Sequence, residues 1–478
     1  MEKQQNWSLI ACVFLFLSLA SQIQCTSQSH SNAIRRINGP SFRTTVSRVN
    51  QQKLKKKDLI KRLPGQPSVK FRQYGGYVAV NESAGQFLYY YFVESIKTND
   101  SSPLVIWFNG GPGCSSLTSA FQSHGPFRIH SDGKTLYHNP YSWNNANMLY
   151  VEAPVQVGFS YTNTPFTYFD SQGDSLTAED NYIFLVKWLE RFPEYKGREF
   201  YIAAQSYGGH YGPQLAQLIL HRKTQTFINL RGMILGNPAF DNEIDSKGND
   251  EYLVGHAYIT KELLAHKNQI CGSTIKINVF SECGKADAKI SMLTRQLDLY
   301  NIYAHVCLNS TVTSKPKKYT TVIEFDPCST HYMTAYLNRE NVQKAMHANT
   351  TKLSYPWRQC MDNTGMYYNS TDLDVSMLPT LHELMGKGIR ILVYSGDLDA
   401  MVSVTSTMHV LEKLNLTVEK TWRPWFSGRE MGGYTEEYKG NFTYATVRGA
   451  GHSVPSDQPI RALTLFTSFI RNTPLPHL

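Results

Sequence analysis

Residues 204–208 read Ala-Gln-Ser-Tyr-Gly, and this stretch decides the fold. The residues before it, 200–203, are Phe-Tyr-Ile-Ala, an apolar and aromatic run that predicts a buried strand. The residues after it, 213–220, space their apolar side chains as a helix does. A serine between small residues at a turn from strand to helix is typical of a nucleophile elbow. Such a tight turn needs small residues on both sides of the serine, and Ala204 and Gly208 satisfy that need.

Predicted strands alternate with predicted helices along most of the chain. The expected strands cover residues 76–80, 86–93, 103–108, 148–154, 231–238, 389–397 and 442–448. An amphipathic helix is expected over 178–192, and a last helix over 459–471. Because alternating strands and helices form mainly parallel sheets, the elbow and this order together predict an α/β-hydrolase fold, with helices on both faces of the central sheet.

The N-terminal residues have the features of a secretion signal. Residues 7–20 are apolar but shorter than the ~20 residues that cross a bilayer, so 1–25 is predicted to be a cleaved signal peptide. Residues 26–60 are polar and poor in aromatic side chains, which favours a basic, flexible leader or propeptide. Residues 35–72 contain twelve lysines or arginines and one acid, Asp58, so the net charge of +9 belongs to this segment. Since a nucleic-acid-binding protein carries its basic residues on a folded domain, no nucleic-acid partner is expected, and no membrane partner after signal removal.

The remaining chain is predicted to form one core interrupted by an insertion. The first part of the core covers 61–239 and the second part covers 376–478. Between them, in 240–375, the strand–helix alternation stops and gives way to lysine-rich loops and short helical patterns. We expect this insertion to form a cap over the carboxyl edge of the sheet.

Cysteines and glycosylation sequons agree with a secreted or vacuolar glycoprotein. Of eight cysteines, Cys12 and Cys25 lie in or beside the signal, and the other six permit fifteen disulfide pairings. Those six are Cys114, Cys271, Cys283, Cys307, Cys328 and Cys360. Asn-x-Ser/Thr sequons beyond the signal begin at Asn81, Asn99, Asn309, Asn349, Asn369, Asn415 and Asn441.

A serine nucleophile needs a base, and the base needs a carboxylate that fixes its tautomer. In this fold the three residues follow one another as Ser, Asp and His. Ser206 is followed by Asp397 and His452, each just past a predicted strand, where α/β sheets place their sites. Asp399 is the alternative acid; Asp397 is preferred because it lies nearer to the strand end.

A second motif, residues 109–116, reads Asn-Gly-Gly-Pro-Gly-Cys-Ser-Ser and predicts a backbone turn that comes close to another group. The backbone at Gly110 and Gly111 is expected to provide an oxyanion donor beside the N–H of Tyr207. Ser115 and Ser116 are expected to support the turn. Metal-binding spacings and phosphate loops are absent from the sequence, so neither a metal nor a cofactor is predicted.

Four motifs in order, at 109–116, 204–211, 394–397 and 449–452, resemble the signatures of serine carboxypeptidases, and of their plant-type branch most. The resemblance covers about residues 60–475. It implies a triad of Ser206, Asp397 and His452, and an oxyanion hole of Gly111 and Tyr207. It implies that Asn109, Gly110 and Gln205 bind the substrate carboxylate. It implies disulfides Cys114–Cys360, Cys271–Cys283 and Cys307–Cys328.

Three positions depart from the pattern of the family that the chain resembles. Members usually carry Glu where this chain has Gln205 and Ser123, and many plant members carry Glu at Ser453. The first hypothesis is a secreted carboxypeptidase that acts on peptides with an altered carboxylate pocket and a shifted acid dependence. An acyltransferase that takes small acyl groups from sugar esters is the second, and a non-catalytic binding glycoprotein is the third. The oligomeric state stays open, with a homodimer as one option.

Overall fold

The computed structural model describes residues 48–97, 101–164, 172–222, 227–272, 281–305, 307–308, 310–317, 326–361 and 368–477. The expected signal peptide, most of the expected leader and the sequons at Asn99 and Asn309 lie outside these residues.

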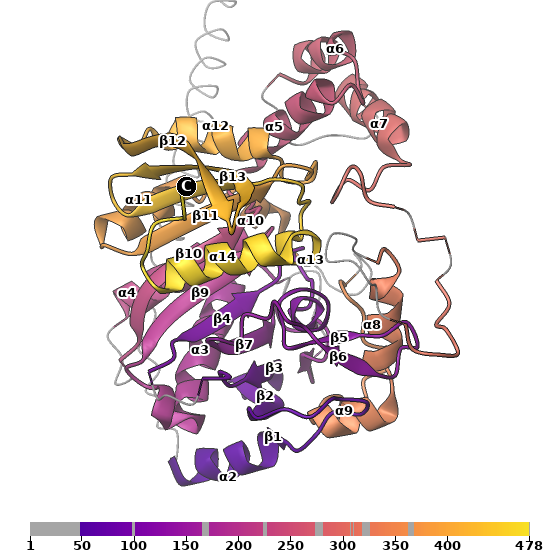
Figure 1. Cartoon of the computed structure of the whole chain (residues 1–478), viewed down its shortest axis with the longest axis vertical. Coiled ribbons are helices and arrows are strands. Elements are labelled where there is room, and N and C mark those ends of the chain that lie inside the picture. Colours follow the sequence, from indigo (N-terminus) through magenta and orange to yellow (C-terminus); the bar gives the residue numbers. More distant parts are fainter. Residues whose placement is uncertain are drawn as a thin grey trace, which may run out of the picture. The chain divides into compact units, whose positions relative to one another are not determined.

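A single large sheet forms the centre of the described chain (Figure 1). Its strands are β1 (Leu59–Ile60), β2 (Gln73–Asn81), β3 (Gln86–Val93), β4 (Leu104–Phe108), β7 (Asn147–Glu152), β8 (Tyr161–Thr162), β9 (Glu199–Gln205), β10 (Asn229–Gly236), β11 (Arg390–Gly396), β12 (Val418–Ser427), β13 (Glu430–Tyr438) and β14 (Phe442–Val447). The spatial order is β1-β2-β3-β7-β4-β9-β10-β11-β14-β13-β12, with β8 beside β3. From β7 to β14 all neighbours are parallel, and the strands outside them pair antiparallel. The predicted mainly parallel α/β-hydrolase sheet is therefore confirmed.

Helices cover both faces of the sheet because side chains alternate along each strand. In β3, Leu88 and Tyr90 pack in one hydrophobic cluster, whereas Tyr89 and Tyr91 pack in the other. The first cluster holds apolar residues of α3 (Asp174–Arg191), α4 (Gly208–His221), α11 (Leu378–Gly386) and α12 (Val404–Leu414). The second holds those of α8 (Ser329–Leu337), α9 (Glu340–Met346) and α14 (Pro459–Ile470). Figure 1 shows α14 lying across its face of the sheet.

Regular structure begins within the expected leader of residues 26–60, so residues 48–60 are not flexible as expected. Residues 48–58 form helix α2 (Arg48–Asp58), and β1 pairs with β2. Asp58 explains why: its carboxylate accepts hydrogen bonds at 2.7 Å from both Arg191 Nη1 and Tyr90 Oη, and all three side chains are buried. This buried ion pair attaches the basic segment to α3 and β3.

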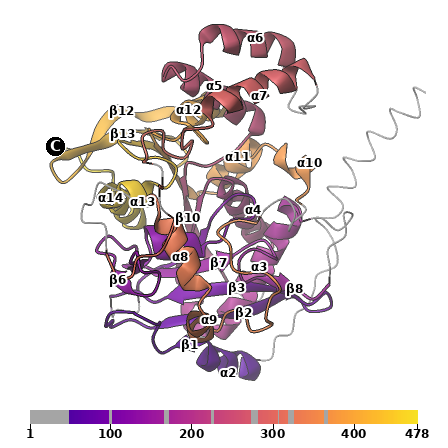
Figure 2. The same cartoon turned by 90° about the vertical axis from the view of Figure 1, so that its right-hand side faces the viewer.

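The predicted insertion at 240–375 has two parts that pack differently. Helices α5 (Asn242–Gly255), α6 (Lys261–Cys271) and α7 (Glu282–Thr294) share a small hydrophobic cluster that includes Leu253, Leu263 and Ile290. In both views α6 and α7 stand apart from the sheet (Figures 1 and 2). By contrast, α8 and α9 belong to the core and contact β5 (Phe127–Ile129) and β2. Figure 2 shows these two helices against the strands.

All three disulfides implied by the family resemblance are present, as Cys114–Cys360, Cys271–Cys283 and Cys307–Cys328. The second joins α6 to α7, and the first ties the glycine loop to a segment 246 residues away. The antiparallel pair β12–β13 extends the sheet beyond β14 and was not predicted. Within the residues that the structure describes, no helix has the length and apolarity to cross a membrane.

Candidate active site

The turn that carries Ser206 lies between β9 and α4, as predicted. Ser206 has a φ of +61°, in the left-handed region that residues other than glycine rarely adopt. Its carbonyl oxygen accepts the N–H groups of Gly209 at 2.8 Å and Ala239 at 3.0 Å. A Cβ atom at Gly208 would lie 2.7 Å from Cβ of Ala204, so only small residues fit on either side of the serine. Ser206 remains partly exposed, whereas its two small neighbours are buried.

The glycine loop packs directly on this elbow. A Cβ atom at Gly110 would lie 2.3 Å from the backbone nitrogen of Tyr207. Gly111 has a φ of +116°, which side chains disfavour. Tyr207 is the N-cap of α4, where backbone N–H groups have no partner inside the helix. Glycines are therefore required here because any side chain would separate the loop from the start of the helix.

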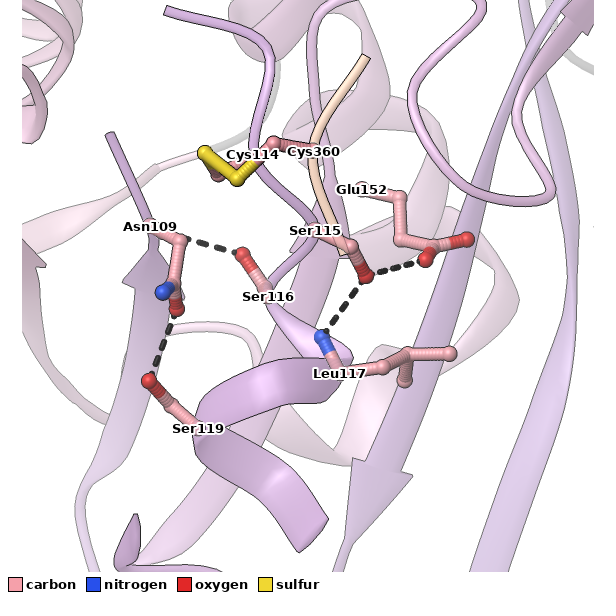
Figure 3. Close-up of a disulfide and its surroundings, with 8 residues drawn as sticks. All are labelled: Asn109, Cys114, Ser115, Ser116, Leu117, Ser119, Glu152 and Cys360. Carbon is pink, nitrogen blue, oxygen red and sulfur yellow. Dashed lines mark hydrogen bonds between the residues drawn. A yellow bond between two sulfur atoms is a disulfide. The ribbon is translucent and has the colours of Figure 1, made fainter. Parts of the chain in front are cut away.

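Serine side chains anchor the glycine loop, as Figure 3 shows. Ser116 Oγ accepts the backbone N–H of Asn109 at 3.1 Å and donates to the carbonyl of Trp107 at 3.2 Å. Ser115 is fully buried and donates its hydroxyl to the carboxylate of Glu152. Both serines therefore have the structural role predicted for them.

Glu152 ends strand β7 beneath the loop and is fully buried. Its Oε1 accepts Trp357 Nε1–H at 2.8 Å, and its Oε2 accepts the N–H of Phe159 at 2.6 Å. Burial raises the pKa of Glu152 to about 7, although the hydrogen bonds from Ser115, Phe159 and Trp357 act in the opposite direction. A carboxyl group that changes charge near neutral pH thus lies directly under the glycine loop.

His452 hydrogen-bonds to Asp399, and this corrects the prediction of Asp397. The distance from His452 Nδ1 to Asp399 Oδ2 is 2.6 Å, and both side chains are buried. Asp399 Oδ2 also accepts Asn237 Nδ2–H at 2.8 Å, and its Oδ1 accepts the N–H of Met401 at 2.8 Å. These bonds fix the carboxylate that orients the imidazole.

Asp397 holds the loop that carries the histidine. Its Oδ1 accepts the backbone N–H of Gly449 at 2.6 Å, and its carbonyl accepts the hydroxyl of Tyr252 at 2.7 Å. Burial raises the pKa of Asp397, although hydrogen bonds from the backbone of Gly449 and Ala450 act in the opposite direction. Asp397, which lies nearest to the end of β11, therefore contacts the loop after β14. The carboxylate that reaches the imidazole of His452 belongs to Asp399, two residues further along the chain.

A second buried Asp–His pair lies under the elbow and was not predicted. Asp174, at the start of α3, accepts hydrogen bonds from His210 Nδ1 and Tyr207 Oη, both at 2.8 Å, and from Tyr368 Oη at 2.5 Å. The rings of Tyr207 and His210 stack at 4.4 Å between centroids. Burial acts to raise the pKa of Asp174, but the hydrogen bonds from His210, Tyr368 and Tyr207 outweigh it and lower that pKa. These contacts fix the side chain of Tyr207, the residue that follows Ser206.

A sequence profile of the serine carboxypeptidase family matches residues 64–472. The chain belongs to the serine carboxypeptidase family. Among curated proteins it is 59% identical to serine carboxypeptidase-like 38 of Arabidopsis thaliana, over 100% of this chain and 99% of that protein. It is 56% identical to serine carboxypeptidase-like 36 of the same plant, again over 100% of this chain and 99% of the relative.

The fold agrees with this family. The structure is similar to that of Kex1(delta)p, a prohormone-processing carboxypeptidase from Saccharomyces cerevisiae, with a TM-score of 0.73. The similarity covers 87% of this chain and 96% of the yeast chain, at 22% sequence identity. At this identity the comparison supports the fold and not the substrate.

The serine carboxypeptidase signature residue Asn109 has a fixed side-chain amide. Its Oδ1 accepts hydrogen bonds from Trp107 Nε1 and from Ser119 Oγ, both at 2.7 Å. The two donors identify the oxygen of the amide, so the Nδ2 group points away from them. Figure 3 shows Asn109 beside the loop that carries Ser115 and Ser116.

Neutral groups occupy the three positions, Gln205, Ser123 and Ser453, at which the family resemblance implies acids. Gln205 Nε2 donates to the carbonyl of His452 at 2.8 Å. The hydroxyls of Ser123, Ser453 and Ser456 form a closed triangle, with oxygen–oxygen distances of 3.0, 2.6 and 2.9 Å. Three hydroxyls can satisfy one another in such a ring without a charge.

The structure places most of the predicted residues in one region, around the elbow and the loop of His452. Reasoning from the sequence preferred Asp397 to Asp399 and did not predict a role for Asp174, Glu152 or Ser456, because the partners of these residues are distant in the chain.

All sequon asparagines within the described residues are partly or fully exposed: Asn81, Asn349, Asn369, Asn415 and Asn441. In the described part of the chain, no cluster of three or more His, Cys, Asp or Glu side chains is arranged to hold a metal ion.

Proposed function

We propose that this protein is a serine-type carboxypeptidase that removes C-terminal residues from peptides. The observation that carries the proposal is the fixed amide of Asn109, whose Nδ2 group is free to donate hydrogen bonds beside the elbow. A donor held in that position recognises a carboxylate close to the bond that Ser206 attacks. Family membership supports the same reaction class.

In the proposed mechanism, Ser206 Oγ attacks the carbonyl carbon of the last peptide bond while His452 accepts the hydroxyl proton. Asp399 holds the imidazole in the tautomer that accepts this proton and stabilises the imidazolium that forms. The N–H groups of Gly111 and Tyr207 stabilise the oxyanion; one such donor is worth about 3–4 kcal/mol of barrier. His452 then returns the proton to the leaving amine, and water hydrolyses the acyl-enzyme by the same route.

The substrate carboxylate is proposed to bind the amides of Asn109 and Gln205 and the backbone at Gly110. Gln205 Nε2 uses one proton on the carbonyl of His452 and retains a second for the substrate. An amide donates at any pH, whereas a glutamic acid must be protonated to do so. The nearby triangle of Ser123, Ser453 and Ser456 is also neutral, so neither Gln205 nor these serines must gain a proton before the substrate carboxylate binds.

The test is release of the C-terminal residue from N-blocked dipeptides between pH 4 and 8. We expect Ser206→Ala to be inactive and Gln205→Glu to move the activity toward lower pH, because a glutamic acid at 205 donates only when protonated. If the wild type is as acid-dependent as Gln205→Glu, the proposed role of the amide is incorrect. A fluorophosphonate probe provides a separate control: no adduct on Ser206 would favour the binding glycoprotein over any enzyme.

A second candidate function is acyl transfer from sugar esters to an acceptor. The neutral Gln205 and the serine triangle favour it, because they impose no requirement for a terminal carboxylate on the donor. Trapping of an acyl-enzyme from glucose esters, together with no turnover of blocked dipeptides, would establish this function in place of the first.

The destination that we propose is the secretory pathway, ending outside the cell or in the vacuole. Three disulfides support it, since such bonds persist in oxidising compartments and are rare in the cytosol. The exposed sequons agree with glycosylation on that route. Mass spectrometry of the mature N-terminus and of glycopeptides would test the signal peptide, the leader and each sequon.

A further inference from the structure

An aromatic pocket lies on the sheet edge formed by β12, β13 and β14, apart from the elbow. Its volume of about 510 Å³ is in the range of sites that bind small molecules. Trp422 forms one wall, with its ring stacked on Tyr434 at 5.6 Å and near-parallel planes, and a second contact to Tyr444 at 6.0 Å. Trp422 is 43% exposed, so part of its indole ring is accessible to a ligand. Met408, Leu411 and Glu412 of helix α12 also line the pocket.

The charged side chains that accompany the aromatic rings are carboxylates. Glu412 and Glu436 both line the pocket, and no lysine or arginine does within the described chain. Glu436 also accepts the N–H of Trp422 at 3.1 Å and the hydroxyl of Tyr438 at 2.6 Å, which fixes the aromatic wall. Carboxylates repel an anionic ligand but accept hydrogen bonds from hydroxyls and amides. The chemistry of the pocket therefore suits a neutral molecule that has both an apolar face and several hydroxyls.

Asn415, a lining residue of this same pocket, begins a glycosylation sequon that continues through Leu416 to Thr417. It caps the C-terminus of α12 in the left-handed conformation, and its N–H donates to the carbonyls of Leu411 and Glu412. Both Asn415 and Thr417 are exposed, as an acceptor asparagine requires. A sugar attached at Asn415 would start within the pocket.

We propose that the first sugars of an N-glycan on Asn415 occupy this pocket and cover Trp422. An N-acetylglucosamine residue has the required properties: it is neutral, it has a face of C–H groups, and it carries hydroxyls and an amide. Its C–H face can pack on the negative face of the indole ring, while Glu412 and Glu436 accept from its polar groups. The glycan would then act as a covalently tethered ligand that shields an exposed aromatic edge of the sheet.

The test uses the full-length protein secreted from plant cells. Glycopeptide mass spectrometry should find Asn415 occupied. On the folded protein, peptide N-glycosidase should release this glycan several-fold more slowly than from the Trp422→Ala variant, because the indole no longer holds the sugar in that variant. An unoccupied Asn415, or equal release from wild type and Trp422→Ala, would overturn the proposal.

Thermal unfolding gives an independent readout that does not depend on enzyme access. Thr417→Ala removes the sequon but keeps Asn415, and should lower the melting temperature. Thr351→Ala is the control at the sequon of Asn349, where Thr351 is exposed and Asn349 is partly exposed. In the Thr417→Ala background, Trp422→Ala should cost less stability than in the wild type, since the sugar contact is already lost. Strictly additive effects would mean that glycan and indole do not interact.

Discussion

His452 Nδ1 lies 2.6 Å from Asp399 Oδ2, and the carboxylate of Asp399 is fully buried. Asp397, two residues earlier, instead accepts the N–H of Gly449 in the loop before the histidine. The two aspartates therefore have separate roles, since Asp399 orients the imidazole and Asp397 positions the loop that carries it.

These separate roles predict different effects for two isosteric changes. Asp399→Asn should lower kcat by roughly 10⁴, because an amide at this position favours the wrong imidazole tautomer. Asp397→Asn should cost far less and act mainly through loop position and stability. The measurement is kcat for a blocked dipeptide, with melting temperatures as the folding control. A larger loss for Asp397→Asn would reverse the assignment.

Asn109→Ala should impair peptide substrates that end in a free carboxylate and spare esters that lack one. Loss of a hydrogen bond to a charged group costs about 1.5–3 kcal/mol, which lowers kcat/KM by roughly ten- to a hundredfold. The same loss on both substrates would show that Asn109 supports the elbow rather than the carboxylate.

The Cys114–Cys360 disulfide should matter for both stability and activity. Replacing both cysteines by alanine should lower the free energy of unfolding by about 2–5 kcal/mol, since the bond closes a very long loop. It should also reduce kcat, because this bond holds the glycine loop that contributes Gly111. The matched control is removal of Cys271–Cys283, which joins two helices and should leave kcat nearly unchanged. Equal losses of kcat in both variants would mean that the Cys114–Cys360 disulfide has no specific role in positioning Gly111.

Glu152 should make stability depend on pH in an unusual direction. Burial raises its pKa from 4.5 to about 7 in the folded state, so that state holds an extra proton between these values. Stability from this group is therefore fully present below about pH 4.5 and is lost as pH rises through about 7, by up to about 3 kcal/mol. The free energy of unfolding, measured with denaturant at several pH values, should change with pH at different slopes for wild type and Glu152→Gln over this range.

An exposed substitution, Glu419→Gln, is the control for the Glu152 experiment. It should leave the pH dependence of the free energy of unfolding unchanged. Parallel curves of the free energy of unfolding against pH for wild type and Glu152→Gln would mean that folding does not raise the pKa of Glu152.

Local sequence signals were sufficient wherever backbone geometry restricts the residue type. The elbow needs Ala204 and Gly208 because any larger side chain would collide, and the glycine loop needs Gly110 for the same reason. The alternation of buried strands and helices predicted the sheet because each strand buries both faces. The helix over 48–58 was missed because its polar composition resembles a flexible leader, whereas Asp58 at its end pairs with Arg191, which is distant in the sequence.

By itself, the sequence determined the elbow, the mainly parallel fold, the serine and the histidine, because these follow from short-range spacing and from motifs of local backbone shape. Only the tertiary structure decided which aspartate serves the histidine. Asp397 and Asp399 are equivalent in residue type and lie on the same turn. Their directions depend on the path of the chain after β11 and on partners from other segments, Gly449 for one and Asn237 for the other.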